Sequence, residues 1–254
     1  MAKDQPDPQG VPDKGKYPSV PDAGLRGVAR TRFDSPNPTA AQLARRAANN
    51  RAIRAMGLPV LEHLPVVEDE AVLKLRTPAE VARRCLAVAF CAVKGELDDQ
   101  KEADALVASL TEEYGAATYF SPKEARFLAD PNPPRQQRID AAWRYECVHV
   151  LLWAMGTRDA LSPPGEICPV PEDMKLLRGA KPAEFVAGAK RRTPEEILAR
   201  ADFYYRLHWA AVELRANRKD SALPYEGILC ERHYALNWLI GYLNQEWDDV
   251  TTDT

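Results

Sequence analysis

Residues 143–156 read WRYECVHVLLWAMG, and this stretch decides the fold class. Its apolar side chains recur at helical spacing on more than one face, which is typical of an α-helix surrounded by other helices. Two further stretches share the pattern: ADFYYRLHWAAVE at 201–213 and ERHYALNWLIGY at 231–242. Because aromatic side chains clustered in helices normally fill a core, we expect these three helices to form an aromatic interior.

Other helices are predicted from their start signals. TPAE at 77–80, SPKE at 121–124 and TPEE at 193–196 each combine a Ser or Thr cap, a Pro at the first helical position and a Glu that closes a capping box. The expected helices run over 38–56, 78–94, 98–114, 122–129, 135–155, 171–178, 182–189, 194–217 and 228–245.

Strand signals are confined to LPVVEDEAVLKLR at 64–76, where one short β-hairpin could form. Strands and helices do not alternate along the chain, so a nucleotide-binding α/β sheet is not expected. We therefore predict a mainly α fold, with a single multi-helix domain over residues 37–254 and at most this one hairpin.

Residues 1–36 contain six of the 21 prolines and almost no apolar periodicity. Such a segment cannot bury enough apolar surface to offset its ordering entropy, so we expect an extended arm. Two interpretations stay open for this arm: a disordered leader, or a segment that docks onto a protein partner.

Composition restricts the class of protein more than its function. An apolar content of 45%, a charged content of 28% and a net charge of −3 are ordinary for a soluble domain of 254 residues. The five Cys are odd in number and form no C-x-x-C pair, which indicates a reducing cytoplasm. No signal peptide opens the chain, and apolar runs such as 85–93 are too short to cross a membrane.

Residues 24–56 carry seven Arg and one acidic residue, Asp34. Aromatic side chains are not interleaved with these arginines, so the pattern does not favour nucleic-acid binding.

Polar side chains interrupt the apolar faces of the three aromatic helices. Glu146, His208 and His233 each fall among apolar residues, and Asn237 follows His233 by one turn. Buried carboxylates and imidazoles must find partners or change protonation state, so we expect these groups to meet. The cluster is either a polar network that fixes helix register or a binding or catalytic pocket.

The chain ends in WDDVTTDT at 247–254. We expect Trp247 to pack back onto the bundle, because a large aromatic side chain is seldom left exposed. Asp248 and Asp249 should then meet one of three arginines that we place on other faces of the aromatic helices: Arg144, Arg206 and Arg232.

Known catalytic motifs are missing, so no catalytic residue is assigned. The sequence has no H-E-x-x-H, no G-x-S-x-G and no Gly-rich phosphate loop. Glu146 and His149 have the spacing of a di-iron ligand pair, but such sites need two copies. His208, His233 and an acid could together hold a metal ion; we nevertheless predict no metal and no cofactor.

The segments WRYECVHVLLWAMG, YYRLHWA, ERHYALNWL and WDDVTTDT resemble a bacterial family defined only as domain of unknown function 4272, over roughly residues 46–254. The resemblance implies no particular activity, cofactor or substrate. It marks a set of signature positions: Arg144, Tyr145, Glu146, Arg206, His208, Trp209, Glu231, Arg232, His233, Asn237, Trp238, Trp247 and Asp248.

Two functions remain open from sequence. We favour a non-catalytic protein-protein interaction or assembly module that uses residues 1–36 or an acidic face. The alternative is a small-molecule-binding protein or hydrolase-like enzyme with its site at Glu146, His208 and His233.

Overall fold

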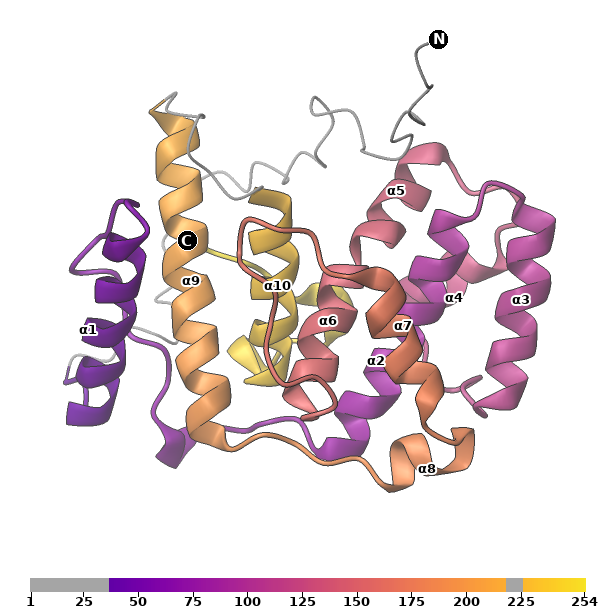
Figure 1. Cartoon of the computed structure of the whole chain (residues 1–254), viewed down its shortest axis with the longest axis horizontal. Helices are drawn as coiled ribbons and strands as arrows, with labels where there is room; N and C mark the ends of the chain where they lie inside the picture. The colour runs from indigo at the N-terminus through magenta and orange to yellow at the C-terminus, as the bar shows by residue number, and fades with distance from the viewer. Residues whose placement is uncertain (1–36, 218–225) are drawn as a thin grey trace, which may run out of the picture.

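The computed structural model describes residues 37–217 and 226–254, and these ranges contain α-helices and short 3-10 turns but no strand (Figure 1). The α-helices are α1 (Ala40–Ala55), α2 (Pro78–Glu96), α3 (Gln100–Glu113), α4 (Pro122–Ala129), α5 (Arg135–Trp143), α6 (Tyr145–Ala154), α7 (Val170–Gly179), α8 (Pro182–Ala187), α9 (Pro194–Ala216) and α10 (Glu226–Leu239). The 3-10 turns are η1 (Glu70–Val72), η3 (Tyr242–Asn244) and η4 (Trp247–Asp249). The mainly α prediction is confirmed, and no helix in the described ranges is both long and apolar enough to cross a membrane.

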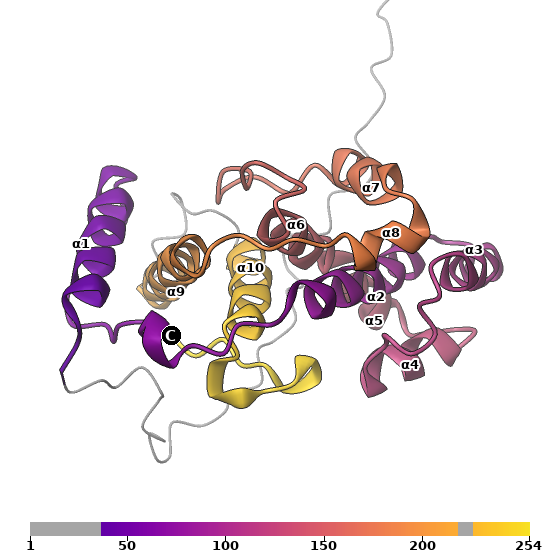
Figure 2. The ribbon, with the colours of Figure 1, turned by 90° about the horizontal axis from the view of Figure 1, so that it is seen from below.

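Five of the helices lie side by side in a row, and further helices pack around one end of this row. From α2 the row continues through α6, α10 and α9 to α1, each helix contacting the next (Figures 1 and 2). α2 also contacts α3, α4, α5 and α8, so it lies at the centre of the thicker end. All ten residues of α6 are buried, as expected for a helix with neighbours on every side.

The helix starts predicted from the three capping boxes, at 78, 122 and 194, are correct because their signals are local. Thr77, Ser121 and Thr193 each accept a hydrogen bond from the backbone amide of the Glu three residues later, and all three capping boxes are complete. Thr39 forms a fourth box with Gln42 at the start of α1.

The hairpin expected at 64–76 is wrong. This segment is extended apart from η1, and its carbonyl groups bind side chains of other elements instead of a second strand. Gln42 of α1 donates to Val67 O at 2.9 Å, and Arg206 of α9 donates to Pro65 O at 2.9 Å. Because α1 and α9 satisfy these groups, the segment packs against helices and not against a second strand.

Two predicted helices are shorter than expected. The helix placed at 135–155 is divided at Arg144, where ψ is −8° and α5 gives way to α6. The last helix ends at Leu239, and Gly241 then takes a φ of +64° with its backbone against Lys74 O. A Cβ at this glycine would lie 2.9 Å from that oxygen, so a side chain could not be accommodated without a shift.

Gly95 allows α2 and α5 to cross at very short range. A Cβ added at Gly95 would lie 2.4 Å from Arg138 O and 2.8 Å from Ala142 N. Both contacts are with the backbone of α5, which cannot be relieved by a side-chain rotation. The position of α5 against α2 therefore depends on the missing side chain.

We expect Gly95→Ala to force α2 and α5 apart and to lower the free energy of unfolding by about 1–3 kcal/mol. For a domain of this size, each kcal/mol corresponds to a decrease in Tm of roughly 2–4 °C. Thermal unfolding followed by circular dichroism measures the change. Gly179→Ala is the control, because a Cβ there meets no atom within 4 Å; equal Tm values for the two variants would contradict the close crossing.

Candidate functional site

The nine candidate site residues comprise the polar cluster, the three arginines, Trp247 and Asp248. In the structure they are divided between the interior and one open cleft. Six lie in the interior away from the cleft: Glu146, Arg206, His208, Arg232, His233 and Asn237. Three line the cleft: Arg144, Trp247 and Asp248.

Arg232 is the centre of the largest buried network. Its side chain has no solvent exposure, and its Nε donates to Glu146 Oε2 at 2.8 Å. Its remaining N–H groups bind Tyr204 OH and three acceptors in the loop 156–169, namely Ser162 O, Ser162 Oγ and Glu166 O. Arg232, expected on another face of α10 than His233, is fully buried with Glu146 as its partner. The network joins α6, α9 and α10 to the loop.

His149 holds the same loop from a second direction. Its Nδ1 lies 2.7 Å from Asp173 Oδ2, and its Nε2 accepts the backbone N–H of Ser162 at 2.9 Å. Serine, histidine and aspartate also make up hydrolase triads, but here the Ser162 hydroxyl binds Arg232 and not the imidazole. The imidazole therefore cannot activate this serine, and the arrangement fixes the loop. Asp173 was missed from sequence because it belongs to a short amphipathic helix, α7.

Arg206 forms a third buried pair, with Asp202 one turn earlier on α9. Nε and Nη2 donate to the two carboxylate oxygens at 2.8 and 2.9 Å, and Asn49 of α1 donates to the same carboxylate at 2.8 Å. Arg206, expected on another face of α9 than His208, is buried there, with 2% of its surface exposed. This pair attaches α1 to α9.

His208 and His233 meet, as predicted, but Glu146 does not join them. Their Nδ1 atoms are 3.1 Å apart, so one ring donates and the other accepts. Burial lowers the pKa of His208 to about 4, and burial with the neighbouring His208 lowers the pKa of His233 well below its ordinary value. Both rings are therefore neutral near pH 7. Glu146 has no part in this pair, because its two oxygens accept from Arg232 and from Cys168 N.

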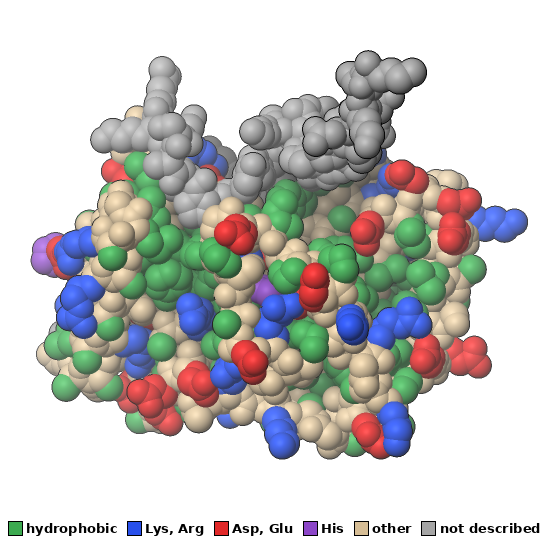
Figure 3. Space-filling view, viewed as in Figure 1, with side chains coloured by type: hydrophobic (Ala, Val, Ile, Leu, Met, Phe, Trp, Pro, Cys, Tyr) green, Lys and Arg blue, Asp and Glu red, His purple; other side chains and the backbone are tan. Residues whose placement is uncertain are grey.

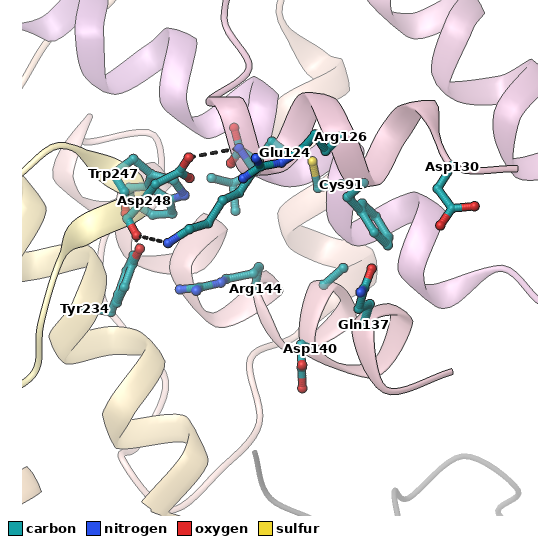
Figure 4. A pocket seen from close by; sticks show the side chains of 14 residues that line it. Cys91, Glu124, Arg126, Asp130, Gln137, Asp140, Arg144, Tyr234, Trp247 and Asp248 are labelled. Atoms are coloured by element: carbon teal, nitrogen blue, oxygen red, sulfur yellow. Dashed lines mark hydrogen bonds between the residues drawn. The ribbon is translucent and has the colours of Figure 1, made fainter. Parts of the chain in front are cut away.

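The open cleft has a volume of about 590 Å³ and lies between α4, α5, α10 and the C-terminal turn η4 (Figure 4). Its apolar lining includes Val88 and Phe127. Figure 4 shows Tyr234, Trp247 and Asp248 on one side and Asp130, Gln137 and Asp140 on the other. The other charged lining residues are Lys123, Glu124, Arg126 and Arg144.

Trp247 closes the aromatic side of the cleft. It is 5% exposed and packs edge-on against Tyr234 and Trp238, with ring centroids 5.0 and 5.5 Å away. Tyr234 OH donates to the Trp247 carbonyl. Asn237 holds the following residues by donating to Thr251 O at 2.8 Å. The expected docking of the tail is confirmed for these contacts.

Asp248 binds a helix end and not an arginine. Its carboxylate accepts from Ser121 Oγ at 2.5 Å and from Lys123 N at 2.9 Å, at the start of α4. The predicted partner was wrong because free amides and the helix dipole make a helix N-terminus an anion site without any charged side chain. Asp248 thus attaches the tail to α4.

Arg144 is held rigidly at the cleft wall. Its Nη1 donates to Glu231 Oε2 at 3.0 Å, and its guanidinium stacks on the Tyr234 ring at 4.1 Å. Burial lowers the pKa of Arg144, but Glu231 and its other neighbours raise it by more, so the net pKa is well above the ordinary value. The side chain is still 30% exposed, so a fixed cation faces the cleft.

The thiol in the cleft lining is shielded from solvent. This residue, Cys91, is 4% exposed, and burial raises its pKa well above the ordinary value, which keeps it in the unreactive neutral form. No histidine lines the cleft within the described part of the chain. Within residues 37–217 and 226–254, no three His, Cys, Asp or Glu side chains are grouped to hold a metal ion. The arm predicted at residues 1–36 lies outside these ranges.

The His208–His233 pair predicts a loss of stability in acid. Their folded pKa values are lowered, so the unfolded chain binds more protons and stability falls as the pH drops from about 7 toward 4. For a pKa of about 4 folded and 6.5 unfolded, His208 alone should remove about 2 kcal/mol between pH 7.5 and 5.0. Urea unfolding at the two pH values measures this difference.

The double variant His208→Gln/His233→Gln should lose most of that pH dependence. The exposed His63 provides the control, since His63→Gln removes an imidazole without touching the pair. Equal pH dependence in the double variant and the wild type would show that the two rings are not the titrating groups.

A model of the protein family described as Domain of unknown function (DUF4272) matches residues 45–250. No curated protein and no solved structure matches the chain. The matched residues include the aromatic helices, the Arg232 network and the cleft lining up to Asp248. The chain therefore belongs to the DUF4272 family.

Proposed function

We propose that this protein is a non-catalytic protein-protein interaction module whose binding surface is the cleft around Arg144. One observation carries the proposal: Arg144, Tyr234 and Trp247 are packed into a fixed group at the edge of an open cleft. Arginine, tyrosine and tryptophan are the residues that most often dominate binding energy at protein interfaces. Because their positions are set by internal contacts, little ordering entropy opposes binding.

The remaining lining residues support binding over catalysis. Glu124 is engaged with Arg84 at 2.5 Å, and Lys123 binds the Asp248 carbonyl. A general acid or base needs a proton-transfer group free to reach its substrate, and Glu124 and Lys123 are held by the protein. Glu146, His208 and His233, the alternative site, are buried away in separate networks, so they lend no support to a hydrolase-like enzyme.

Surface charge gives no support to nucleic acid as the partner. On the face shown in Figure 3, cationic and acidic side chains are interspersed and no broad basic surface is present. Proteins that bind nucleic acid through the phosphate backbone need such a surface.

Small-molecule binding is the second candidate. A volume of about 590 Å³ lies within the range of ligand pockets, roughly 300–1,000 Å³. An apolar lining with a few fixed polar groups is also typical of such pockets.

We further propose that residues 1–36 add contacts to the same partner and that the protein works in the cytoplasm. All five cysteines are free thiols, which a reducing compartment accounts for. The prolines of residues 1–36 suit an extended segment that becomes ordered on a partner.

A photo-crosslinking amino acid placed at Gln137, an exposed residue of the cleft, should capture a specific protein in cells that make this chain. Capture should fall at least about fivefold with Arg126→Glu, since a reversed charge at an interface weakens association. Arg51→Glu is the control, because Arg51 is an exposed cation of α1, remote from the cleft. Deleting residues 1–36 should lower capture as well.

Capture that is equal in Arg126→Glu and Arg51→Glu would exclude the cleft as the interface. A small molecule retained in native mass spectrometry, with no captured protein, would favour the second candidate.

A further inference from the structure

The cleft has cationic hydrogen-bond donors that the protein does not use. Arg144 donates only from Nη1 within the described residues, to Glu231 and Cys147, which leaves Nε and Nη2 without an acceptor. Arg126 is exposed, lines the same cleft and makes no hydrogen bond or ion pair in the described ranges. Planar guanidinium groups bind carboxylates and phosphates through paired N–H donors.

The acidic residues of the cleft favour a carboxylate over a phosphate as the bound anion. Asp130 and Asp140 line the side opposite Trp247, and their carboxylates point away from Arg144 (Figure 4). Lys123, Glu124 and Asp248 are engaged, and the charge of Arg144 is already paired with Glu231. Among the described residues, one unpaired cation, Arg126, then faces the two acids, so the open cleft has no excess positive charge. A doubly charged phosphate would be poorly compensated, whereas a singly charged carboxylate could be held by one guanidinium.

The walls next to Arg144 indicate what carries this carboxylate. Tyr234 and Phe127 are half-buried and present aromatic surface to the cleft, whereas Trp247 and Val88, 5% and 1% exposed, are almost fully buried in its wall. An apolar or aromatic body would bury surface against these walls while its carboxylate met the guanidinium groups.

We infer that the cleft binds a carboxylate attached to an apolar or aromatic body, with Arg144 and Arg126 as the anion-binding groups. The inference rests on the proposed function, because it assigns the ligand of the same cleft. Two sources share this chemistry: a free organic acid, and the C-terminal residue of a partner protein. The second source agrees with an interaction module.

Trp247 provides a reporter inside the site. The protein is labelled with 5-fluorotryptophan, and the resonance of Trp247, one of five, is assigned with a Trp247→Phe variant. Three probes of one shape are titrated: 3-phenylpropionate, the neutral 3-phenylpropanamide and the cationic 3-phenylpropylamine. The propionate should shift the Trp247 signal saturably, and the amide should bind at least about tenfold more weakly, because it lacks a charge-assisted hydrogen bond.

Variants of Arg126 and Arg51 test which cation binds the carboxylate of the probe. Arg126→Gln should weaken the propionate severalfold and leave the amide unchanged, while Arg51→Gln should change neither. Since Arg126 is exposed and unpaired in the described ranges, its replacement should not disturb folding. Phenyl phosphate binding more tightly than the propionate, or equal binding of acid and amide, would overturn the inference.

Two peptides distinguish a partner protein's C-terminus from a free organic acid as the source of the carboxylate. Acetyl-Gly-Phe with a free C-terminus should bind more tightly than its C-terminal amide if a partner's chain end is the ligand. If 3-phenylpropionate binds and neither peptide does, the carboxylate site is supported and the natural ligand is a small organic acid. If no probe shifts Trp247 while capture at Gln137 still depends on Arg126, the ligand class is wrong and the proposed interaction function is unaffected.

Discussion

A guanidinium without solvent exposure, that of Arg232, is the constraint on which the rest of the structure depends. An unpaired charge in a protein interior costs several kcal/mol, so each of its five N–H donors must have an acceptor. Glu146, Tyr204, Ser162 and Glu166 supply these acceptors from α6, α9 and the loop 156–169. The three elements can move relative to α10 only if the network breaks, which fixes the register of α10.

The cleft takes its geometry from this register. Glu231, the residue before Arg232 in α10, accepts a hydrogen bond from Arg144. Tyr234, two residues after Arg232, stacks against the guanidinium of Arg144. His233, between them, turns to His208. Neighbouring side chains in one turn of α10 therefore point into the core, to α9 and to the cleft. Buried contacts thus position Arg144 and Tyr234 at the cleft.

The structural features that could be predicted from sequence are those set by residues close together in the chain. Helix starts follow from caps and prolines within four residues, as Thr77 and Glu80 illustrate, and the apolar periodicity of 143–156 correctly indicated a helix surrounded by others. The complete burial of Arg232 could not be predicted from the same pattern, because arginine is rarely buried.

Partners separated in sequence could not be chosen either. Nothing in the sequence distinguishes Arg232 from His208 as the partner of Glu146, because all lie on buried helices. The partner of Asp248 was hidden for a different reason, since backbone amides at the start of α4 carry no sequence signature of charge. At 64–76 the alternation suggested a strand, whereas α1 and α9 bind those carbonyls.

The contact between Asp248 and α4 joins residues that are 125 to 127 positions apart, and it has a consequence for local dynamics. The Lys123 amide proton is held by the Asp248 carboxylate and not by its own helix. When the tail lifts, this proton becomes open to solvent while the α2 and α6 cores remain closed. The hydrogen-exchange rate of that single amide thus measures how often the native molecule opens the wall of its own cleft.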